Sequence, residues 1–216
     1  MKRIFTSILL SLSFFISGTA QDADALLSKL SENANTFDSI DATYTSTILD
    51  VKSDFEETLN GYIQIEENKF KLDLGEFVII TDGVSVWTYE KESNDCYIED
   101  AEMLAEQGID PSKIFTIWED DFKNEWMGVR TVEGRELVQV NLYPTGDEAL
   151  EKAYHTIQLF IDKSALEVVQ LVIKGRSGVD TDYQINSFKT GMNIPASTFL
   201  FTESDFPGVT MIDNRI

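Results

Sequence analysis

The sequence predicts a mainly β protein of the α+β class, built on one large curved antiparallel sheet with helices across its concave face. Three observations predict this fold. Apolar residues recur with a period of two in successive short segments, turn residues separate those segments, and two stretches have helical spacing instead. We count ten to twelve strands in this way, which favours a single large curved sheet or barrel.

The first twenty residues have the pattern of a signal peptide. Lys2 and Arg3 provide a positive start, residues 4–16 are apolar apart from Thr and Ser, and residues 18–20 are small. We therefore expect a cleaved signal peptide over residues 1–20 and a single domain over residues 21–216. Because residue 21 is Gln and not Cys, we expect no bacterial lipid anchor but an exported, soluble protein.

The mature chain is expected to open with an amphipathic helix that Asp22 caps. The apolar residues that follow recur at helical spacing, and they are Leu26, Leu27, Leu30, Ala34 and Phe37. The period then changes to two. Strands are expected over residues 40–48, 70–74, 77–81, 84–89, 129–132, 135–143, 154–161, 166–173 and 179–188, with short pieces near Phe199 and Val209.

A second helix is expected to interrupt these strands. Asp110 is its expected N-cap and Pro111 suits the first helical position. Apolar residues then follow at helical spacing: Ile114, Phe115, Trp118 and Phe122. Such a helix needs an apolar surface to cover, and the concave face of the sheet would provide one.

The charge of the chain excludes some partners. Loss of Lys2 and Arg3 takes the formal net charge from −21 to −23, so nucleic acid and anionic membranes are poor electrostatic partners. Two interpretations stay open: the carboxylates only keep an exported domain dispersed, or they let it approach membranes transiently without sticking.

Residues suited to catalysis are scarce. His155 is the only histidine, Cys96 is the only cysteine, and the segment from Gly175 to Gly178 lacks the spacing of a nucleophile elbow. We expect no enzyme and no cofactor, a packed or edge-strand thiol at Cys96, and a structural histidine at His155. A dyad of the two would change this expectation only if they met in space.

Carboxylates that could hold a hard cation occur at Asp180 and Asp182 and over residues 119–121. None of these stretches has the glycine and terminal glutamate of an EF-hand loop. We interpret them as solvated charge and expect no metal site.

Several segments, taken in order, resemble the periplasmic outer-membrane lipoprotein carrier family, the LolA-like proteins. The resemblance covers essentially all of the mature chain. Its segments are Leu26-Leu27 with Leu30, residues 37–44, Gly61-Tyr62-Ile63, residues 81–89, Ile114-Phe115, Val140-Asn141-Leu142-Tyr143-Pro144, Phe199-Leu200-Phe201 and residues 206–213.

The resemblance implies an unclosed barrel of about eleven antiparallel strands, with helices forming a lid over an apolar cavity. It implies a carrier that binds the acyl chains of lipoproteins and shuttles them from the inner to the outer membrane. The implied partners are acylated lipoproteins, an inner-membrane releasing transporter and an outer-membrane acceptor, and we expect the carrier to be a monomer. The family's Arg-Pro pair is missing, because Glu66-Glu67-Asn68-Lys69 stands before Phe70. Control of the lid, or the cargo, must therefore differ.

Large apolar side chains are the expected lining of such a cavity, since they offer wide apolar area with few rotatable bonds. The expected lid residues are Leu27, Leu30, Ile114, Phe115 and Trp118. The expected lipid-binding wall residues are Tyr44, Ile48, Phe70, Leu72, Phe77, Ile79, Trp87, Tyr89, Phe199 and Phe201.

Two alternatives to lipoprotein carriage stay open. One is a binding protein or sensor for other lipids or apolar ligands in the periplasm. The other is a domain whose interior is filled by side chains, because periodicity does not distinguish a filled interior from a hollow one.

Overall fold

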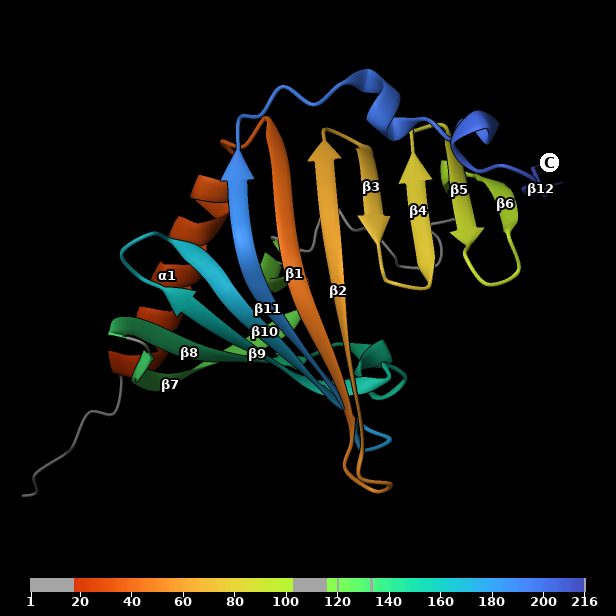
Figure 1. Cartoon of the computed structure of the whole chain (residues 1–216). Helices are drawn as coiled ribbons and strands as arrows, with labels where there is room; N and C mark the ends of the chain where they lie inside the picture. Colours follow the sequence, from red (N-terminus) through yellow and green to blue (C-terminus); the bar gives the residue numbers. More distant parts are fainter. Residues whose placement is uncertain (1–17, 103–115, 120, 133, 216) are drawn as a thin grey trace, which may run out of the picture.

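The computed structural model describes residues 18–102, 116–119, 121–132 and 134–215. Helix α1 (Gly18–Ala34) precedes twelve strands that form one sheet (Figure 1). The strands are β1 (Ser39–Asp50), β2 (Phe55–Glu66), β3 (Lys69–Asp73), β4 (Phe77–Thr81), β5 (Ser85–Glu90), β6 (Asp95–Asp100), β7 (Phe122–Val132), β8 (Arg135–Pro144), β9 (Tyr154–Asp162), β10 (Glu167–Gly175), β11 (Val179–Thr190) and β12 (Thr210–Asp213).

The sheet is open and curved. Its strand order is β12-β6-β5-β4-β3-β2-β1-β11-β10-β9-β8-β7, so β12 and β7 are the two edges of the described sheet. Neighbouring strands are antiparallel except β12 and β6, which are parallel. The predicted fold class, a mainly β protein on one large unclosed sheet, is confirmed.

The opening helix is confirmed, although its limits differ from those expected. It begins at Gly18, so Asp22 lies inside it and is not the N-cap, and it ends at Ala34, before Phe37. In the uncleaved chain the backbone before Asp22 continues the helix, and the spacing of apolar residues does not mark where a helix begins. Cleavage after Ala20 stays a prediction.

The second helix does not extend to Phe122. Ile117–Glu119 form a short 3-10 helix, η2, while Phe122 is the first residue of β7. Half-buried Phe122 and Trp126 alternate with exposed Lys123 and Glu125, and this period of two is that of a strand. Asp110, Pro111, Ile114 and Phe115 lie outside the described residues.

Two strands were not predicted from the sequence, and one predicted piece differs. The missed strands are β2, whose first half is polar and exposed, and β6, which is only six residues long. The piece expected near Phe199 is a 3-10 helix, Ala196–Phe199, and the piece expected near Val209 is β12.

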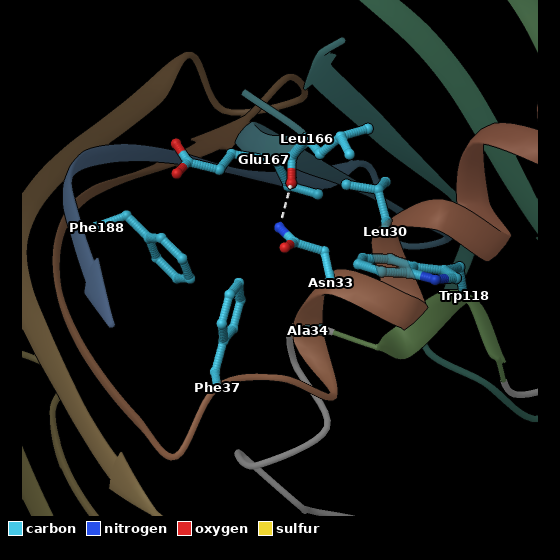
Figure 2. Close-up of a pocket in the computed structure, with 9 residues that line it drawn as sticks. Leu30, Asn33, Ala34, Phe37, Trp118, Leu166, Glu167 and Phe188 are labelled. Atoms are coloured by element: carbon cyan, nitrogen blue, oxygen red, sulfur yellow. Dashed lines mark hydrogen bonds between the residues drawn. The ribbon is translucent and has the colours of Figure 1, made fainter. Parts of the chain in front are cut away.

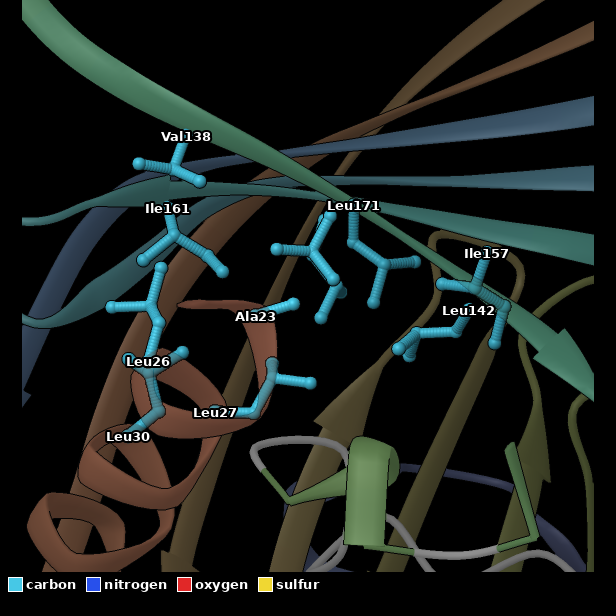
Figure 3. Close-up of a cluster of buried hydrophobic side chains, with 11 residues drawn as sticks. Ala23, Leu26, Leu27, Leu30, Val138, Leu142, Ile157, Ile161 and Leu171 are labelled. Atoms are coloured by element: carbon cyan, nitrogen blue, oxygen red, sulfur yellow. The ribbon is translucent and has the colours of Figure 1, made fainter. Parts of the chain in front are cut away.

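Helix α1 packs against the face of β8, β9 and β10. Figure 3 shows its Leu26, Leu27 and Leu30 directed toward Ile161 and Leu171 of the sheet. All five side chains are buried, and burial of an aliphatic side chain contributes about 1.5–3 kcal/mol. This cluster is the main core of the molecule. None of the helices that the structure describes is long and apolar enough to cross a membrane.

Candidate functional site: an apolar hollow beside helix α1

The register of the sheet defines which side chains share the face that α1 covers, called the inner face here. Residues directly opposite each other on neighbouring strands point to the same side. Leu171 of β10, which contacts α1, lies opposite Tyr183 of β11, and Tyr183 lies opposite Ser46 of β1. The inner face therefore continues from β10 through β1 toward β6.

A hollow lies on the inner face at the C-terminal end of α1. Its cavity volume is about 20 Å³, and it is partly open to solvent. Figure 2 shows its walls, which come from α1, η2, the turn between β9 and β10, and the segments that flank β1 and end β11. The lining residues are Leu30, Asn33, Ala34, Phe37, Trp118, Leu166, Glu167, Val168 and Phe188.

The turn between β9 and β10 places Leu166 in this wall. Oδ1 of Asp162 accepts hydrogen bonds from the backbone N–H groups of Ser164 and Ala165 and from the Ser164 hydroxyl at 2.6–3.1 Å. These bonds lower the pKa of the Asp162 carboxyl, which favours its charged form. Leu166 then adopts a φ of 54°, and its carbonyl accepts a hydrogen bond of 3.3 Å from Nδ2 of Asn33.

Aromatic side chains form the other walls. The indole N–H of Trp118 donates to the Ser31 hydroxyl at 2.8 Å, which fixes the ring against α1. Phe37 and Phe188 lie edge to face, with ring centroids 5.7 Å apart. Both rings also pack against a second buried cluster on the inner face, against which half-buried Leu72 and Ile79 pack as well. The hollow is therefore one end of a continuous apolar surface.

The ten expected wall residues divide between the two faces of the sheet. Phe70, Leu72 and Ile79 connect through the register to inner-face Ile63 and Ile65. The same register places six of the ten on the inner face, namely Tyr44, Ile48, Phe70, Leu72, Phe77 and Ile79. None of these six is among the residues that line the hollow itself, but Phe70, Leu72 and Ile79 belong to the cluster beside it.

The other four lie on the outer face. Trp87 and Tyr89 alternate with Thr88, which pairs with inner-face Ile79, so both point away from the hollow. Phe201 packs against Tyr89 with ring centroids 6.1 Å apart, and the ammonium of Lys69 lies 5.5 Å from the ring of Phe199. The C-terminal segment thus packs on the outer face, and these four residues lie on the opposite side of the sheet from the other six.

Tyr44 has a packing role. Its hydroxyl donates to the backbone carbonyl of Asp73 at 2.8 Å, and its ring lies edge to face with Tyr183, 5.8 Å between centroids. Burial raises the pKa of the Tyr44 hydroxyl, which keeps it a neutral donor.

The structure describes three of the five expected lid residues, and their role as a lid stays a prediction. Leu30 and Trp118 line the hollow, and Leu27 is buried between α1 and the sheet. Ile114 and Phe115 lie outside the described residues. Seven of the nine lining residues were not nominated from the sequence: Asn33, Ala34, Phe37, Leu166, Glu167, Val168 and Phe188. Phe37 shares the helical spacing of the apolar residues of α1, and this pattern was the only sequence signal for the lining residues that were missed.

The two residues considered for catalysis, Cys96 and His155, lie far apart in the sheet. Cys96 is buried in β6, where burial raises its thiol pKa to about 11, so it is a packed thiol. His155 is exposed at the start of β9, and its Nδ1 lies 2.8 Å from the Thr156 hydroxyl. Strands β5, β4, β3, β2, β1, β11 and β10 separate the two in the sheet, so they form no dyad.

Asp180 and Asp182 have partners within the sheet. Asp180 forms an ion pair of 2.7 Å with Lys174, and Asp182 accepts hydrogen bonds from the side chain of Gln170 at 2.7 and 2.9 Å. Across the described residues, no three His, Cys, Asp or Glu side chains gather in a way that would hold a metal ion.

Comparison with known proteins defines a fold class. No family model and no curated protein matches the chain. Among solved structures, an uncharacterized conserved protein from Thermus thermophilus is similar over 90% of this chain and 100% of its own, with a TM-score of 0.58 and 13% identity. The two chains share the fold.

Other solved structures match with lower TM-scores. A LolA superfamily protein from Nitrosomonas europaea matches with a TM-score of 0.42 and 12% identity, covering 85% of this chain and 98% of that one. The lipoprotein LppX from Mycobacterium tuberculosis matches with a TM-score of 0.47 and 10% identity, covering 80% and 99%. At these identities the likeness concerns the fold alone.

Proposed function

We propose that this protein carries an apolar ligand, such as a lipid acyl chain, on the inner face of its sheet. The observation that carries the proposal is the hollow at the end of α1, where Leu30, Phe37, Trp118 and Phe188 converge and which continues into a half-buried apolar surface. Apolar concave sites with a few polar groups are the usual form of a small-molecule site.

The hollow must widen to hold a whole acyl chain. Its cavity volume of about 20 Å³, room for about one water molecule, is far below the roughly 300–1,000 Å³ typical of ligand sites. Each buried methylene contributes about 0.8 kcal/mol, so a sixteen-carbon chain could contribute about 12 kcal/mol. Parting α1 from the turn at Leu166 would consume part of this energy, and that cost also makes release possible.

The more specific role is lipoprotein carriage through the periplasm, from an inner-membrane transporter to an outer-membrane acceptor. The sequence resemblance, the signal-peptide pattern and the acidic surface support it. Because the family's Arg-Pro pair is missing, contacts on α1 would have to control opening here. The hydrogen bond of Asn33 to the Leu166 carbonyl and that of Trp118 to Ser31 are such contacts. Carriage of other periplasmic lipids is the alternative.

Native mass spectrometry of the protein purified from its exporting cell tests the proposal. Copurified acylated lipoprotein would support lipoprotein carriage, and copurified free glycerolipid would support the alternative. Protein that is free of ligand, and that stays so after incubation with either lipid class, would contradict both.

A further inference from the structure

The hairpin of β1 and β2 ends in an exposed tip, formed by residues 49–57. Figure 1 shows this hairpin reaching beyond the neighbouring strands at the lower end of the view. The tip carries three exposed apolar side chains: Val51 is 65% exposed, Phe55 is 52% exposed and Leu49 is 37% exposed. Apolar side chains gathered on a protruding end of a protein indicate an interaction site.

Hydrogen bonds hold the tip in one conformation. The Asp50 carboxylate accepts hydrogen bonds from the Lys52 backbone N–H at 2.9 Å and from the Ser53 hydroxyl at 2.7 Å. The backbone N–H of Val51 donates to the Gly178 carbonyl at 3.1 Å, which joins the tip to the turn between β10 and β11. A partner therefore does not have to order the tip when it binds.

The apolar side chains of the tip leave it in different directions. Leu49 follows inner-face Ile48 and so points to the outer face, because side chains alternate along a strand. Phe55 lies opposite Asp50, which is two residues after Ile48, so Phe55 points to the inner face. Val51 lies in the turn between them. A protein pocket receives side chains from one side, whereas a fluid lipid surface accepts all three, so this arrangement favours lipid.

The charge of the tip determines which lipid it suits. Asp50, Asp54, Glu56 and Glu57 surround the apolar side chains, and Lys52 is the one cation of the tip. Anionic lipid head groups would repel these carboxylates within about a Debye length, roughly 8–10 Å. The ammonium group of a zwitterionic lipid such as phosphatidylethanolamine can instead donate hydrogen bonds to them.

The elements beside the tip do not reverse its charge. Lys174 forms an ion pair with Asp180, and the Arg176 guanidinium donates to backbone carbonyls of the loop between β8 and β9. That loop, residues 145–153, has more acidic than basic residues. This end of the sheet is therefore acidic around its exposed apolar side chains.

We propose that the tip of the β1–β2 hairpin docks on zwitterionic lipid membranes. Phe55 and Val51 enter the membrane interface, and the carboxylates around them meet ammonium head groups. The docking is weak and reversible, because two partly exposed side chains bury little apolar area. It uses the hairpin and not the hollow, so it does not rest on the proposed function.

Flotation of the protein with large unilamellar vesicles, over a series of lipid concentrations, measures its partition coefficient. One set of vesicles is an equimolar mixture of phosphatidylethanolamine and phosphatidylcholine. The other set contains phosphatidylglycerol in place of phosphatidylcholine. We expect the protein to bind the first set, and to bind the second set several-fold more weakly at low salt. High salt should reduce this difference, because it screens the repulsion.

A pair of double variants tests whether the tip makes the contact. Val51→Ser combined with Phe55→Ser should lower the partition coefficient about tenfold. The control combines Val84→Ser with Leu200→Ser, whose side chains are 72% and 48% exposed. Val84 lies in the turn between β4 and β5, at the opposite end of the sheet (Figure 1). The control should bind vesicles as wild type does.

Four results would overturn the inference. Unchanged binding of the tip variant, or an equal loss in the control, would remove the tip as the docking site. Tighter binding to the phosphatidylglycerol vesicles would contradict the choice of lipid. Failure to bind either set would exclude membrane docking and leave a protein pocket as the partner of the tip. Loss of vesicle binding in Phe188→Ser, which changes the hollow alone, would show that lipid binds there instead.

Discussion

The ring of Tyr44 on β1 lies across Gly61 on β2, its direct partner in the register. A Cβ atom at position 61 would overlap both the Tyr44 ring and the backbone carbonyl oxygen of Asp73. Glycine is thus the residue that lets the aromatic ring lie flat on the neighbouring strand, and the Tyr44 hydroxyl reaches the same Asp73 carbonyl. The three residues tie β1, β2 and β3 together on the inner face.

The substitution Gly61→Ala should destabilise the protein, although alanine ordinarily suits a strand better than glycine. The backbone oxygen of Asp73 cannot move aside without disturbing β3, so we expect a loss of about 1–3 kcal/mol in the free energy of unfolding by urea. Glu56→Ala, exposed on the same strand, is the control and should change little. A Gly61→Ala variant as stable as wild type would contradict the close approach.

Tyr44→Phe should cost about 0.5–1.5 kcal/mol, because it deletes the donor to the Asp73 carbonyl and leaves the ring in place. Tyr62→Phe serves as its control, since the ring of Tyr62 contacts Lys71 and no hydrogen bond of its hydroxyl occurs in the described residues. Equal unfolding midpoints for the two variants would show that the Tyr44 hydroxyl does not contribute.

Substitutions at Phe188 and Phe201 form a matched pair that tests which face of the sheet binds the ligand. Both are half-buried phenylalanines, but Phe188 lines the hollow and Phe201 packs on the outer face. Phe188→Ser should weaken binding of monolauroylglycerol about tenfold, which corresponds to about 1.4 kcal/mol, whereas Phe201→Ser should leave the Kd unchanged. The reverse order would move the site to the outer face.

Glu167 should make stability depend on pH in a defined direction. Burial, together with the charge of Asp162, raises the pKa of its carboxyl in the folded state. The contribution of Glu167 to the free energy of unfolding is therefore fully present below the pKa of the unfolded state, near 4.3. It is lost as the pH rises through the pKa of the folded state. Glu167→Gln should raise the free energy of unfolding at pH 7 and have no effect at pH 3. A gain of equal size at both pH values would exclude ionisation as the cause.

Much of the fold was predictable because period-two alternation requires no tertiary information. Most strands follow from this alternation and helix α1 follows from the helical spacing of its apolar residues, whereas the missed β2 shows the limit of such patterns. The first half of β2 is exposed on both sides, so its polar residues carry no alternation. The expected helix over 110–122 failed at its end because Phe122 and Trp126 suit either period in isolation.

The site was less predictable, because the face that a strand side chain occupies depends on register. Trp87 and Tyr89 are large aromatic residues of the kind expected in a cavity wall. Each is one residue away from inner-face Thr88, however, and this places both side chains on the outer face. Phe37 and Phe188 lie near opposite ends of the mature chain and meet only because β1 pairs with β11. The pairing of distant strands cannot be deduced from the local pattern of either.

The most direct measurement of where an acyl chain binds is tryptophan quenching by a brominated lipid, since the chain has three tryptophans and bromine quenches only at close range. One variant keeps only Trp118, with Trp87→Phe and Trp126→Phe. The other keeps only Trp87, with Trp118→Phe and Trp126→Phe. If the chain lies in the hollow, a dibromostearoyl glycerol will quench Trp118 and leave Trp87 unquenched. Quenching of Trp87 without Trp118, or of neither residue at saturating lipid, would contradict the account.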